Sequence, residues 1–146
     1  MFFRISLILI AVLVTACSEP DFTDHQGNSG KFDDLGGRWM IINYWATWCK
    51  PCIEEIPELN QFSKAHGNDV ALFGVEFDQH QGEKLQNNIA KLGIEFPVLL
   101  DDPAPMLGIS KPLGLPTTFV FNRSGELHQV LKGPQTNATL LAAIAD

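Results

Sequence analysis

The sequence is poor in cysteine and in basic residues, and it has no apolar run long enough to span a membrane. Only 3 of its 146 residues are cysteine, and 10 lysine and arginine residues stand against 17 acidic ones, for a net charge of −7. So acidic a chain lacks the positive surface that nucleic acids and anionic lipid headgroups attract, which excludes both as electrostatic partners. Its composition, 45% apolar and 18% charged with no internal repeat, is typical of one globular domain.

An uncharged stretch, residues 5–16, follows Arg4 at the N-terminus. It falls short of the ~20 apolar residues that a membrane-spanning helix needs, and it ends in small residues, as export signals do. Its last residues together with Cys17 resemble a bacterial lipoprotein signal, in which the cysteine is lipidated and becomes the mature N-terminus. We therefore expect residues 1–16 to be a signal peptide and Cys17 to carry the lipid. The alternatives are a plain cleaved signal or a short signal anchor, with Cys17 incidental to either.

Lipid on Cys17 would leave Cys49 and Cys52 as the only thiols, in an exported chain where disulfides persist. They then pair with each other or with a cysteine of a partner. The two cysteines follow the apolar run 40–45 and precede a helical pattern, which places them in the first turn of a helix. Unpaired backbone N–H groups and the positive end of the helix dipole favour a thiolate there. This is how a cysteine becomes reactive near neutral pH.

The rest of the chain alternates between strand and helix patterns. Apolar runs predict strands over residues 40–45, 70–75, 96–100, 117–121 and 126–131, the last two joined as a hairpin. Residues 18–38 are polar and indicate a tether followed by a short irregular hairpin. Strands alternating with helices, followed by a hairpin and a helix, describe a mixed sheet with helices on both faces.

Apolar residues at helical spacing predict the helices between these strands. The first helix begins at the cysteines and stops near Gly67, and the second ends at Gly93. Pro57 should kink the first helix, because proline has no N–H to donate to the preceding turn. Residues 103–108 form a turn or a single helical turn. The last helix runs from Thr136 or Asn137 to Ala145, with Leu140, Leu141 and Ile144 toward the core.

Three blocks of the sequence resemble the thioredoxin superfamily and, within it, the exported, membrane-anchored thiol-disulfide reductases related to TlpA and ResA. The blocks are Trp45-Ala46-Thr47-Trp48-Cys49-Lys50-Pro51-Cys52, Gly93-Ile94-Glu95-Phe96-Pro97-Val98 and Gly114-Leu115-Pro116-Thr117-Thr118-Phe119. The resemblance runs from about Asp21 to the C-terminus. It implies a thioredoxin fold over residues 31–146 with an N-terminal hairpin extension, preceded by a lipidated tether and irregular extension at 17–30.

The resemblance implies dithiol-disulfide exchange by Cys49 and Cys52, which form the redox disulfide. Cys49, at the exposed start of the helix, attacks a disulfide as a thiolate. Cys52, one turn further in, then attacks the mixed disulfide and releases the reduced substrate. Pro51 fits the first helical turn, where its missing N–H costs nothing. Lys50 is either a positive charge that tunes the thiolate or a solubilising surface lysine.

The resemblance also implies a cis peptide bond before Pro116, packed beside the dithiol. Such a bond fixes a tight bend and lets the backbone of Leu115 pair with a substrate strand. Trp48, next to the nucleophile, is expected to lie partly exposed over the site and to shape the contact with substrate. For Pro116 the alternative is an ordinary trans proline that closes a loop.

Asn43 stands where thioredoxins commonly carry a buried acid, two residues before Trp45. An amide cannot accept a proton, so Asn43 cannot be the proton acceptor. Some reductases of the TlpA and ResA type place an acid near the end of the next strand instead. Asp78 matches that position best and Glu76 second. Strand alternation would put both on one face, and a solvated strand end is the alternative.

Zinc binding is an alternative to the oxidoreductase function, because Cys-x-x-Cys is half of many structural zinc sites. No second cysteine pair is present, and the four histidines, His25, His66, His80 and His128, lack close pairing. We therefore expect no metal and no cofactor. A peroxidase would place one peroxidatic cysteine in a different proline and threonine context. A disulfide oxidase or isomerase on the same site stays open, as does a non-enzymatic metal- or partner-binding module.

We expect a monomeric, lipid-anchored oxidoreductase that faces the periplasm and reduces disulfide-containing protein substrates. The lipid on Cys17 would hold it at the inner or the outer membrane. A membrane electron donor of the DsbD or CcdA type would reduce it again. Its substrate would be the apocytochrome thiols of cytochrome c maturation, a damaged disulfide or one dedicated client.

Replacing Cys17 tests the lipid anchor. We expect the full-length wild-type chain, expressed in bacteria, to incorporate labelled palmitate, and Cys17→Ala to incorporate none, because the acyl acceptor is gone. Cys49→Ala is the matched control and should be labelled like the wild type. Equal incorporation by the wild type and Cys17→Ala would contradict the anchor.

Overall fold

The computed structural model describes residues 19–145 of the chain. The expected signal peptide at residues 1–16 and the lipidated Cys17 lie outside the described residues. Within residues 19–145, no helix is both long enough and apolar enough to cross a bilayer.

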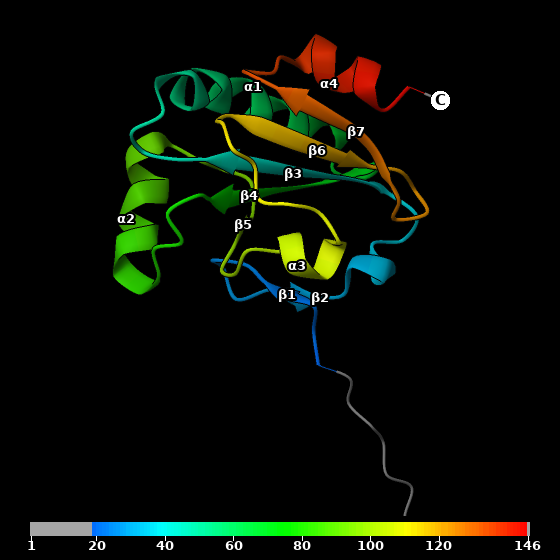
Figure 1. Ribbon diagram of the computed structural model, residues 1–146, viewed down its shortest axis with the longest axis horizontal. Coiled ribbons are helices and arrows are strands. Elements are labelled where there is room, and N and C mark those ends of the chain that lie inside the picture. Colours follow the sequence, from blue (N-terminus) through cyan, green and yellow to red (C-terminus); the bar gives the residue numbers. More distant parts are fainter. Residues whose placement is uncertain (1–18, 146) are drawn as a thin grey trace, which may run out of the picture.

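A five-stranded mixed sheet forms the centre of the fold, in the order β5-β4-β3-β6-β7 (Figure 1). Strand β3 (Trp39–Trp45) pairs parallel with β4 (Val70–Glu76) and antiparallel with β6 (Thr117–Phe121). Every residue of these three strands is buried, which explains their near-continuous apolar runs. The edges are β5 (Val98–Leu99) and the largely exposed β7 (Leu127–Lys132). The predicted mixed sheet is confirmed.

Helices cover the sheet on both faces. Helix α1 (Lys50–His66) packs beside α4 (Asn137–Ala143) over one face, and α2 (Gly82–Leu92) flanks the same apolar cluster (Figure 1). The short helix α3 (Ala104–Leu107) and the hairpin of β1 (Phe22–Thr23) and β2 (Ser29–Gly30) lie on the opposite face. A 3-10 turn, Phe32–Asp34, follows the hairpin. The N-terminal extension is thus a two-stranded hairpin, as predicted.

Strand β3 contributes to two separate cores because its side chains alternate between the faces of the sheet. Ile41 and Trp45 belong to the cluster under α1, α2 and α4. Ile42 and Tyr44 belong to the cluster toward the hairpin and α3. Asn43 has the parity of Ile41 and Trp45, so its side chain lies on the α1 face, directly below the helix that follows the cysteines.

The predicted helix ends agree closely with the structure. Cys49 is the N-cap of α1, and Gly67 is its C-terminal cap residue. Gly93 ends α2 with a φ of 65°, a left-handed conformation that glycine adopts without strain. Thr136 begins α4 with a capping box. Pro57 lies inside α1, which is helical from Lys50 to His66 without a break.

Two predictions about local structure are wrong. Leu141 is 42% exposed, whereas Leu140 is fully buried and Ile144 packs against the core. Successive residues of a helix are about 100° apart, so a seven-residue helix that buries Leu140 turns Leu141 away. The strand predicted over 96–100 is only the two-residue β5, because only Val98 and Leu99 pair with β4.

Gly74 allows the closest packing in the sheet. It lies in β4, where a β-carbon would come within 2.8 Å of Phe96 Cε2 and 2.9 Å of Trp45 Nε1. Both rings are fully buried and have no room to move. The close approach of these two aromatic residues to the strand therefore depends on glycine at this position.

We expect Gly74→Ala to lower the free energy of unfolding by about 1–3 kcal/mol, because the added methyl group overpacks the core. Urea denaturation of the disulfide-bonded protein measures this. Gly114→Ala is the matched control, since its methyl group would meet nothing within 4 Å. A Gly74→Ala protein as stable as Gly114→Ala would show that the core has room here.

Candidate active site

Cys49 and Cys52 lie at the start of α1, directly after β3, and are joined by a disulfide of 2.04 Å. The Cys49 Sγ accepts a hydrogen bond from the backbone N–H of Cys52 at 3.3 Å, so the sulfur itself caps the helix. Pro51 occupies the first turn of the helix. The predicted position of the dithiol is confirmed.

Cys49 is less exposed than the sequence suggested. Its exposed fraction is 5% and that of Cys52 is 0%, so only an edge of Cys49 reaches the surface. Cys49 is part of the apolar cluster under α1, and its backbone N–H donates to the Ala46 carbonyl at 3.2 Å. In the disulfide form, an attacking group therefore reaches the pair only through Cys49.

A buried carboxyl group that the sequence analysis missed, Glu55, lies one helical turn after Cys52. It is 2% exposed. Its Oε1 accepts from Asn43 Nδ2 at 2.8 Å, and its Oε2 accepts from the backbone N–H of Gln135 at 2.7 Å. Burial raises the pKa of Glu55 to about 7, although both hydrogen bonds act to lower it. Glu55 therefore exchanges its proton near neutral pH.

Asn43, in the central strand β3, donates a hydrogen bond to the Glu55 carboxyl group. Its Nδ2 donates to Glu55 and also to Thr118 Oγ1, at 3.0 Å, while its Oδ1 has no partner among the described residues. An amide thus occupies the strand position, and the acid comes from the helix. Helical spacing could have revealed this, because Glu55 is three residues from Cys52 and four from Leu59, both buried on the same face.

The two acids predicted as proton acceptors lie elsewhere. Glu76 is 1% exposed at the end of β4, and it accepts from Asn88 Nδ2 at 2.6 Å and from the His80 backbone N–H at 2.9 Å. Asp78 is exposed in the turn after β4 and accepts from Trp48 Nε1 at 2.8 Å. They do not share a strand face, because β4 ends at Glu76. Glu55 is the buried carboxyl group nearest to Cys52 in the helix.

The segment before β6 has the predicted cis peptide bond between Leu115 and Pro116. The Pro116 carbonyl accepts from the Gly133 N–H at 2.9 Å, which joins this bend to the end of β7. Among residues 19–145, no hydrogen bond engages the backbone N–H or carbonyl of Leu115. The pairing of Leu115 with a substrate strand therefore stays a prediction, and these two groups have no backbone partner within the described part of the chain.

A groove of about 530 Å³ lies alongside the cis bond. Its apolar lining comprises Pro112, Leu113, Leu115, Pro116, Phe119 and Val130. Leu113 is fully exposed and Val130 is 40% exposed. This part of the surface therefore offers apolar contacts next to a backbone that lacks partners.

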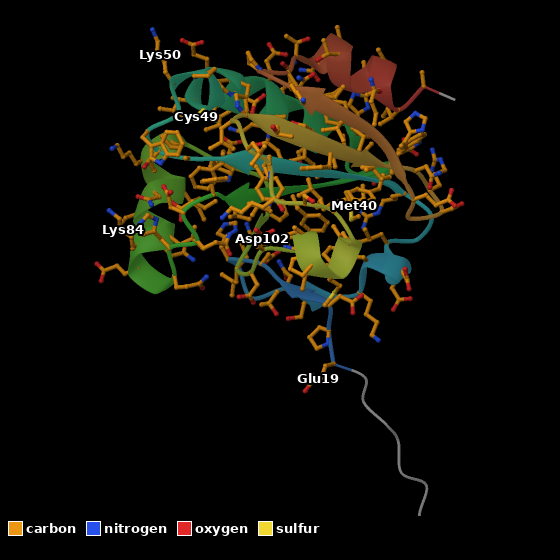
Figure 2. The ribbon with its side chains drawn as sticks, in the orientation of Figure 1. Glu19, Met40, Cys49, Lys50, Lys84 and Asp102 are labelled. Atoms are coloured by element: carbon orange, nitrogen blue, oxygen red, sulfur yellow. A yellow bond between two sulfur atoms is a disulfide. The ribbon has the colours of Figure 1, made fainter. Side chains whose placement is uncertain are left out.

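Trp48 and Lys50 flank Cys49 on the surface. Trp48 is 63% exposed, as predicted for a residue that lies over the site. The Lys50 side chain points away from the molecule and is 88% exposed, with its Nζ 3.9 Å from Glu54 (Figure 2). A solvated lysine with a carboxylate beside it has little effect on a nearby thiolate. This geometry favours the surface-lysine interpretation of Lys50.

Residues 19–145 contain no group of three or more histidine, cysteine, aspartate or glutamate side chains placed to hold a metal ion. The four histidines are dispersed in separate packing and hydrogen-bonding environments. His25 accepts from the Val98 N–H, His80 contacts Glu76, His66 packs on Phe62 and His128 packs on Trp39.

Comparison with known proteins identifies the family of the chain. Residues 15–130 match the AhpC/TSA family. A thiol-disulfide oxidoreductase ResA of Geobacillus kaustophilus is 32% identical over 122 residues, which cover 80% of this chain and 68% of that protein. The ResA of Bacillus subtilis is 31% identical over 124 residues, 83% of this chain and 69% of that protein. The chain belongs to the AhpC/TSA family and to its ResA-like thiol-disulfide oxidoreductases.

Solved structures show the same fold for this ResA-like chain. The crystal structure of StoA from Bacillus subtilis has a TM-score of 0.69 at 26% identity, covering 84% of this chain and 92% of that one. A thioredoxin family thiol:disulfide interchange protein from Chlorobium tepidum has a TM-score of 0.68 at 27% identity, covering 88% and 97%. The thioredoxin fold is therefore confirmed, and Cys49–Cys52 is the Cys-x-x-Cys pair of the oxidoreductase.

The pKa of Glu55 predicts how the stability of the ResA-like chain depends on pH. The folded protein keeps this proton up to about pH 7, whereas in the unfolded chain the pKa of the same group has its ordinary value of 4.5. The folded state therefore binds more protons between these values, and its stabilisation is complete below pH 4.5 and is lost as pH rises through 7. At most about 3 kcal/mol is involved.

We expect Glu55→Gln to lack this dependence, because glutamine does not titrate. Urea denaturation of the oxidised proteins at several pH values should show the wild type losing stability relative to Glu55→Gln between pH 4.5 and 8. Glu54→Gln, on the exposed side of the same helix, is the control and should run parallel to the wild type. A difference between wild type and Glu55→Gln that stays constant with pH would contradict the raised pKa.

Proposed function

We propose that this oxidoreductase reduces the disulfides of other proteins. The observation that carries the proposal is the buried Glu55 carboxyl group one helical turn from Cys52, in a site where the basic residue between the cysteines, Lys50, is solvated. A dithiol that is stabilised as a thiolate makes a strong oxidant. A buried acid beside the pair acts in the opposite sense, because its negative charge opposes a second one on sulfur. Such a pair gives up its electrons readily.

The reaction is a pair of exchange steps. The Cys49 thiolate attacks one sulfur of a client disulfide, the client S–S bond breaks, and the second client sulfur leaves as a thiolate. The Cys52 thiolate then attacks Cys49 Sγ and releases the first client sulfur. Two electrons have passed to the client, which takes up two protons, and Cys49 and Cys52 are left as a disulfide. A dithiol donor must reduce them again.

Glu55 would accept the proton of the Cys52 thiol before the second step. A group with a pKa of about 7 is matched to this task near neutral pH. The hydrogen bonds from Asn43 and Gln135 occupy both carboxylate oxygens and fix the group in place. This role replaces the one that the sequence suggested for Asp78 or Glu76.

The client would bind across the loops that surround Cys49. Leu115 offers unpaired backbone groups for a client strand, next to the bend at Pro116. Trp48 offers an exposed ring next to the nucleophile in the chain. This extended surface supports thiol-disulfide exchange with proteins as well as with small disulfides.

We infer that the protein works as a monomer outside the cytoplasm, held to a bacterial membrane by lipid on Cys17 after removal of residues 1–16. Of the expected tether and extension at 17–30, residues 22–30 form the hairpin packed on the thioredoxin-like domain, so residues 17–21 would connect the lipid to it. The export-type N-terminus and the ResA-like family support this arrangement. A membrane dithiol donor of the DsbD or CcdA type would supply electrons, and apocytochromes are candidate clients.

Replacing Cys52 with serine should arrest the cycle after its first step. We expect reduced Cys52→Ser protein to accumulate mixed disulfides with client proteins that dithiothreitol releases, because no second thiol remains to resolve them. Non-reducing gels and mass spectrometry of the adducts measure this. The wild type, supplied with dithiothreitol, should reduce insulin catalytically.

The double variant Cys49→Ser with Cys52→Ser is the control and should form no adduct. Absence of adducts with Cys52→Ser, together with no insulin reduction by the wild type, would overturn the proposed function. Adducts that persist in the double variant would show that Cys49 is not the attacking group.

A further inference from the structure

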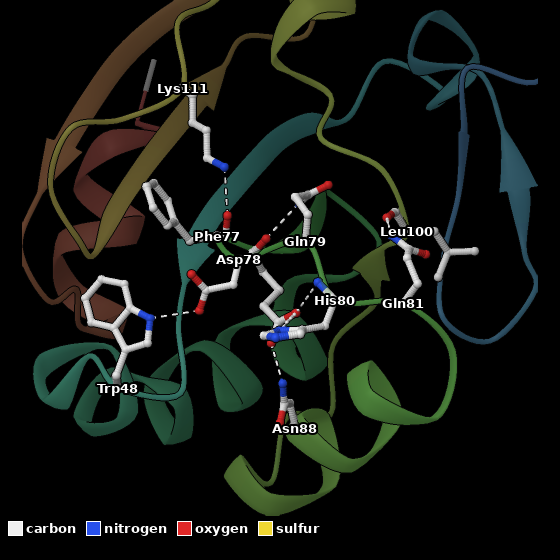
Figure 3. Close-up of polar contacts among 10 residues, drawn as sticks. Trp48, Phe77, Asp78, Gln79, His80, Gln81, Asn88, Leu100 and Lys111 are labelled. Carbon is white, nitrogen blue, oxygen red and sulfur yellow. Dashed lines mark hydrogen bonds and ion pairs between the residues drawn. The ribbon is translucent and has the colours of Figure 1, made fainter.

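Three loops that are far apart in the sequence meet at Phe77, which packs against Trp48, the neighbour of Cys49 in the chain. They are the loop after β3 that carries Trp48, the turn 77–80 after β4, and the segment 108–116 before the cis proline. Figure 3 shows side chains from all three in one connected set of contacts. These contacts are not explained by the exchange chemistry.

The first contact holds an exposed tryptophan. Trp48 is 63% exposed, yet its Nε1–H donates to Asp78 Oδ2 at 2.8 Å (Figure 3). The Trp48 ring also packs edge-on against Phe77, with 6.3 Å between ring centroids and 89° between planes. A hydrogen bond at one end and a ring contact at the other leave the indole a single orientation.

The second contact joins the segment before the cis proline to the same turn. Lys111 Nζ donates to the Phe77 carbonyl at 2.7 Å and lies 4.2 Å from the centroid of the Phe77 ring. The ammonium thus holds both the backbone and the ring of one residue. Because the Phe77 ring also packs against Trp48, Lys111 and Trp48 both contact the same ring.

The turn 77–80 is held in place by hydrogen bonds to Glu76, the last residue of β4. Glu76, 1% exposed, accepts hydrogen bonds from Asn88 of α2 and from the backbone and ring of His80. Gln79 has a φ of 55°, and its Nε2 donates to the Glu76 carbonyl at 2.7 Å. Both ends of the turn are therefore anchored, which gives Phe77 and Asp78 fixed positions.

We propose that Asp78 and Lys111 are positioning residues that fix the Trp48 ring and the 110–116 segment as the two sides of the client-binding surface, Asp78 by its hydrogen bond to Trp48 and Lys111 by its contacts with Phe77. This rests on the proposed exchange with proteins. A surface whose side chains are already ordered loses less conformational entropy when a protein binds. Small disulfides touch only the sulfur of Cys49 and gain nothing from that order. Asp78 thereby has a positioning role in place of proton transfer.

Kinetics with two substrates test the proposal. We expect Asp78→Ala and Lys111→Met each to raise the KM for insulin about three- to ten-fold, with kcat and the rate with a small aromatic disulfide within about two-fold of the wild type. Asp78→Asn keeps an acceptor and Lys111→Arg keeps a cation, so both should restore KM. The double variant should raise KM by less than the product of the two single effects, because Asp78 binds Trp48 and Lys111 binds Phe77, and these two rings contact each other.

Matched controls separate these effects from loss of charge. Asp101→Ala removes an exposed acid, and Lys84→Met removes a lysine that points outward from α2 (Figure 2). Neither should change KM. An unchanged KM in Asp78→Ala and Lys111→Met would overturn the proposal. Equal losses with insulin and with the small disulfide would also overturn it, because they would place Asp78 in the chemical step.

Nuclear magnetic resonance gives a readout that does not require activity. The Trp48 Nε1–H should exchange slowly with solvent in the wild type and in Asp78→Asn, and rapidly in Asp78→Ala. If the wild type fails to reduce insulin while this pattern holds, the proposed function fails and the positioning role stands. Rapid exchange in the wild type would overturn the positioning role itself.

Discussion

The hydrogen bonds from Asn43 and Gln135 to Glu55 join the three parts of the fold that meet beneath the dithiol. Asn43 lies in the central strand, Glu55 in α1, and Gln135 in the segment that leads into α4. A carboxyl group with no contact to water needs these donors, because burying it without them costs several kcal/mol. The same contacts that hold α1 and the segment before α4 on the sheet therefore also set the charge next to Cys52.

That charge gives the site its chemical character. The start of α1 favours a thiolate at Cys49, through the helix dipole and the N–H of Cys52. Glu55 opposes negative charge deeper in the site, at Cys52. The two cysteines thus lie in different environments. Cys49 is favoured as the attacking thiolate, whereas Cys52 is favoured as a thiol until its proton is removed. A buried acid that titrates near neutral pH can link these two states.

Much of the fold follows from the sequence because its signals are local. The fully apolar runs predict β3, β4 and β6, and Gly67, Gly93 and Thr136 mark helix ends by cap chemistry. The prediction that Leu141 faces the core is wrong, because a helix of seven residues buries only a narrow stripe of side chains. Periodicity alone does not locate that stripe. The site was predicted less completely than the fold. Cys49, Cys52 and the cis bond at Pro116 were found by motif, whereas Glu55 was missed because an acid in a helix usually faces solvent.

Tertiary contacts explain the remaining differences. Asp78 is two residues beyond Glu76 but lies outside the strand, where it can reach Trp48, and no sequence pattern encodes that contact. No sequence pattern indicates the role of Lys111, because its hydrogen-bond partner is a backbone carbonyl 34 residues away. Residues that hold the loops in place depend on how the chain closes around the site, which the sequence specifies only through the complete fold.

The reduction potential of the Cys49–Cys52 couple, measured by equilibration with a glutathione or dithiothreitol buffer, tests the central claim most directly. If the buried acid keeps the dithiol from being stabilised as a thiolate, the potential should lie near or below that of thioredoxin, about −270 mV. A potential close to the value of about −120 mV that characterises DsbA would contradict the account and make the protein an oxidant.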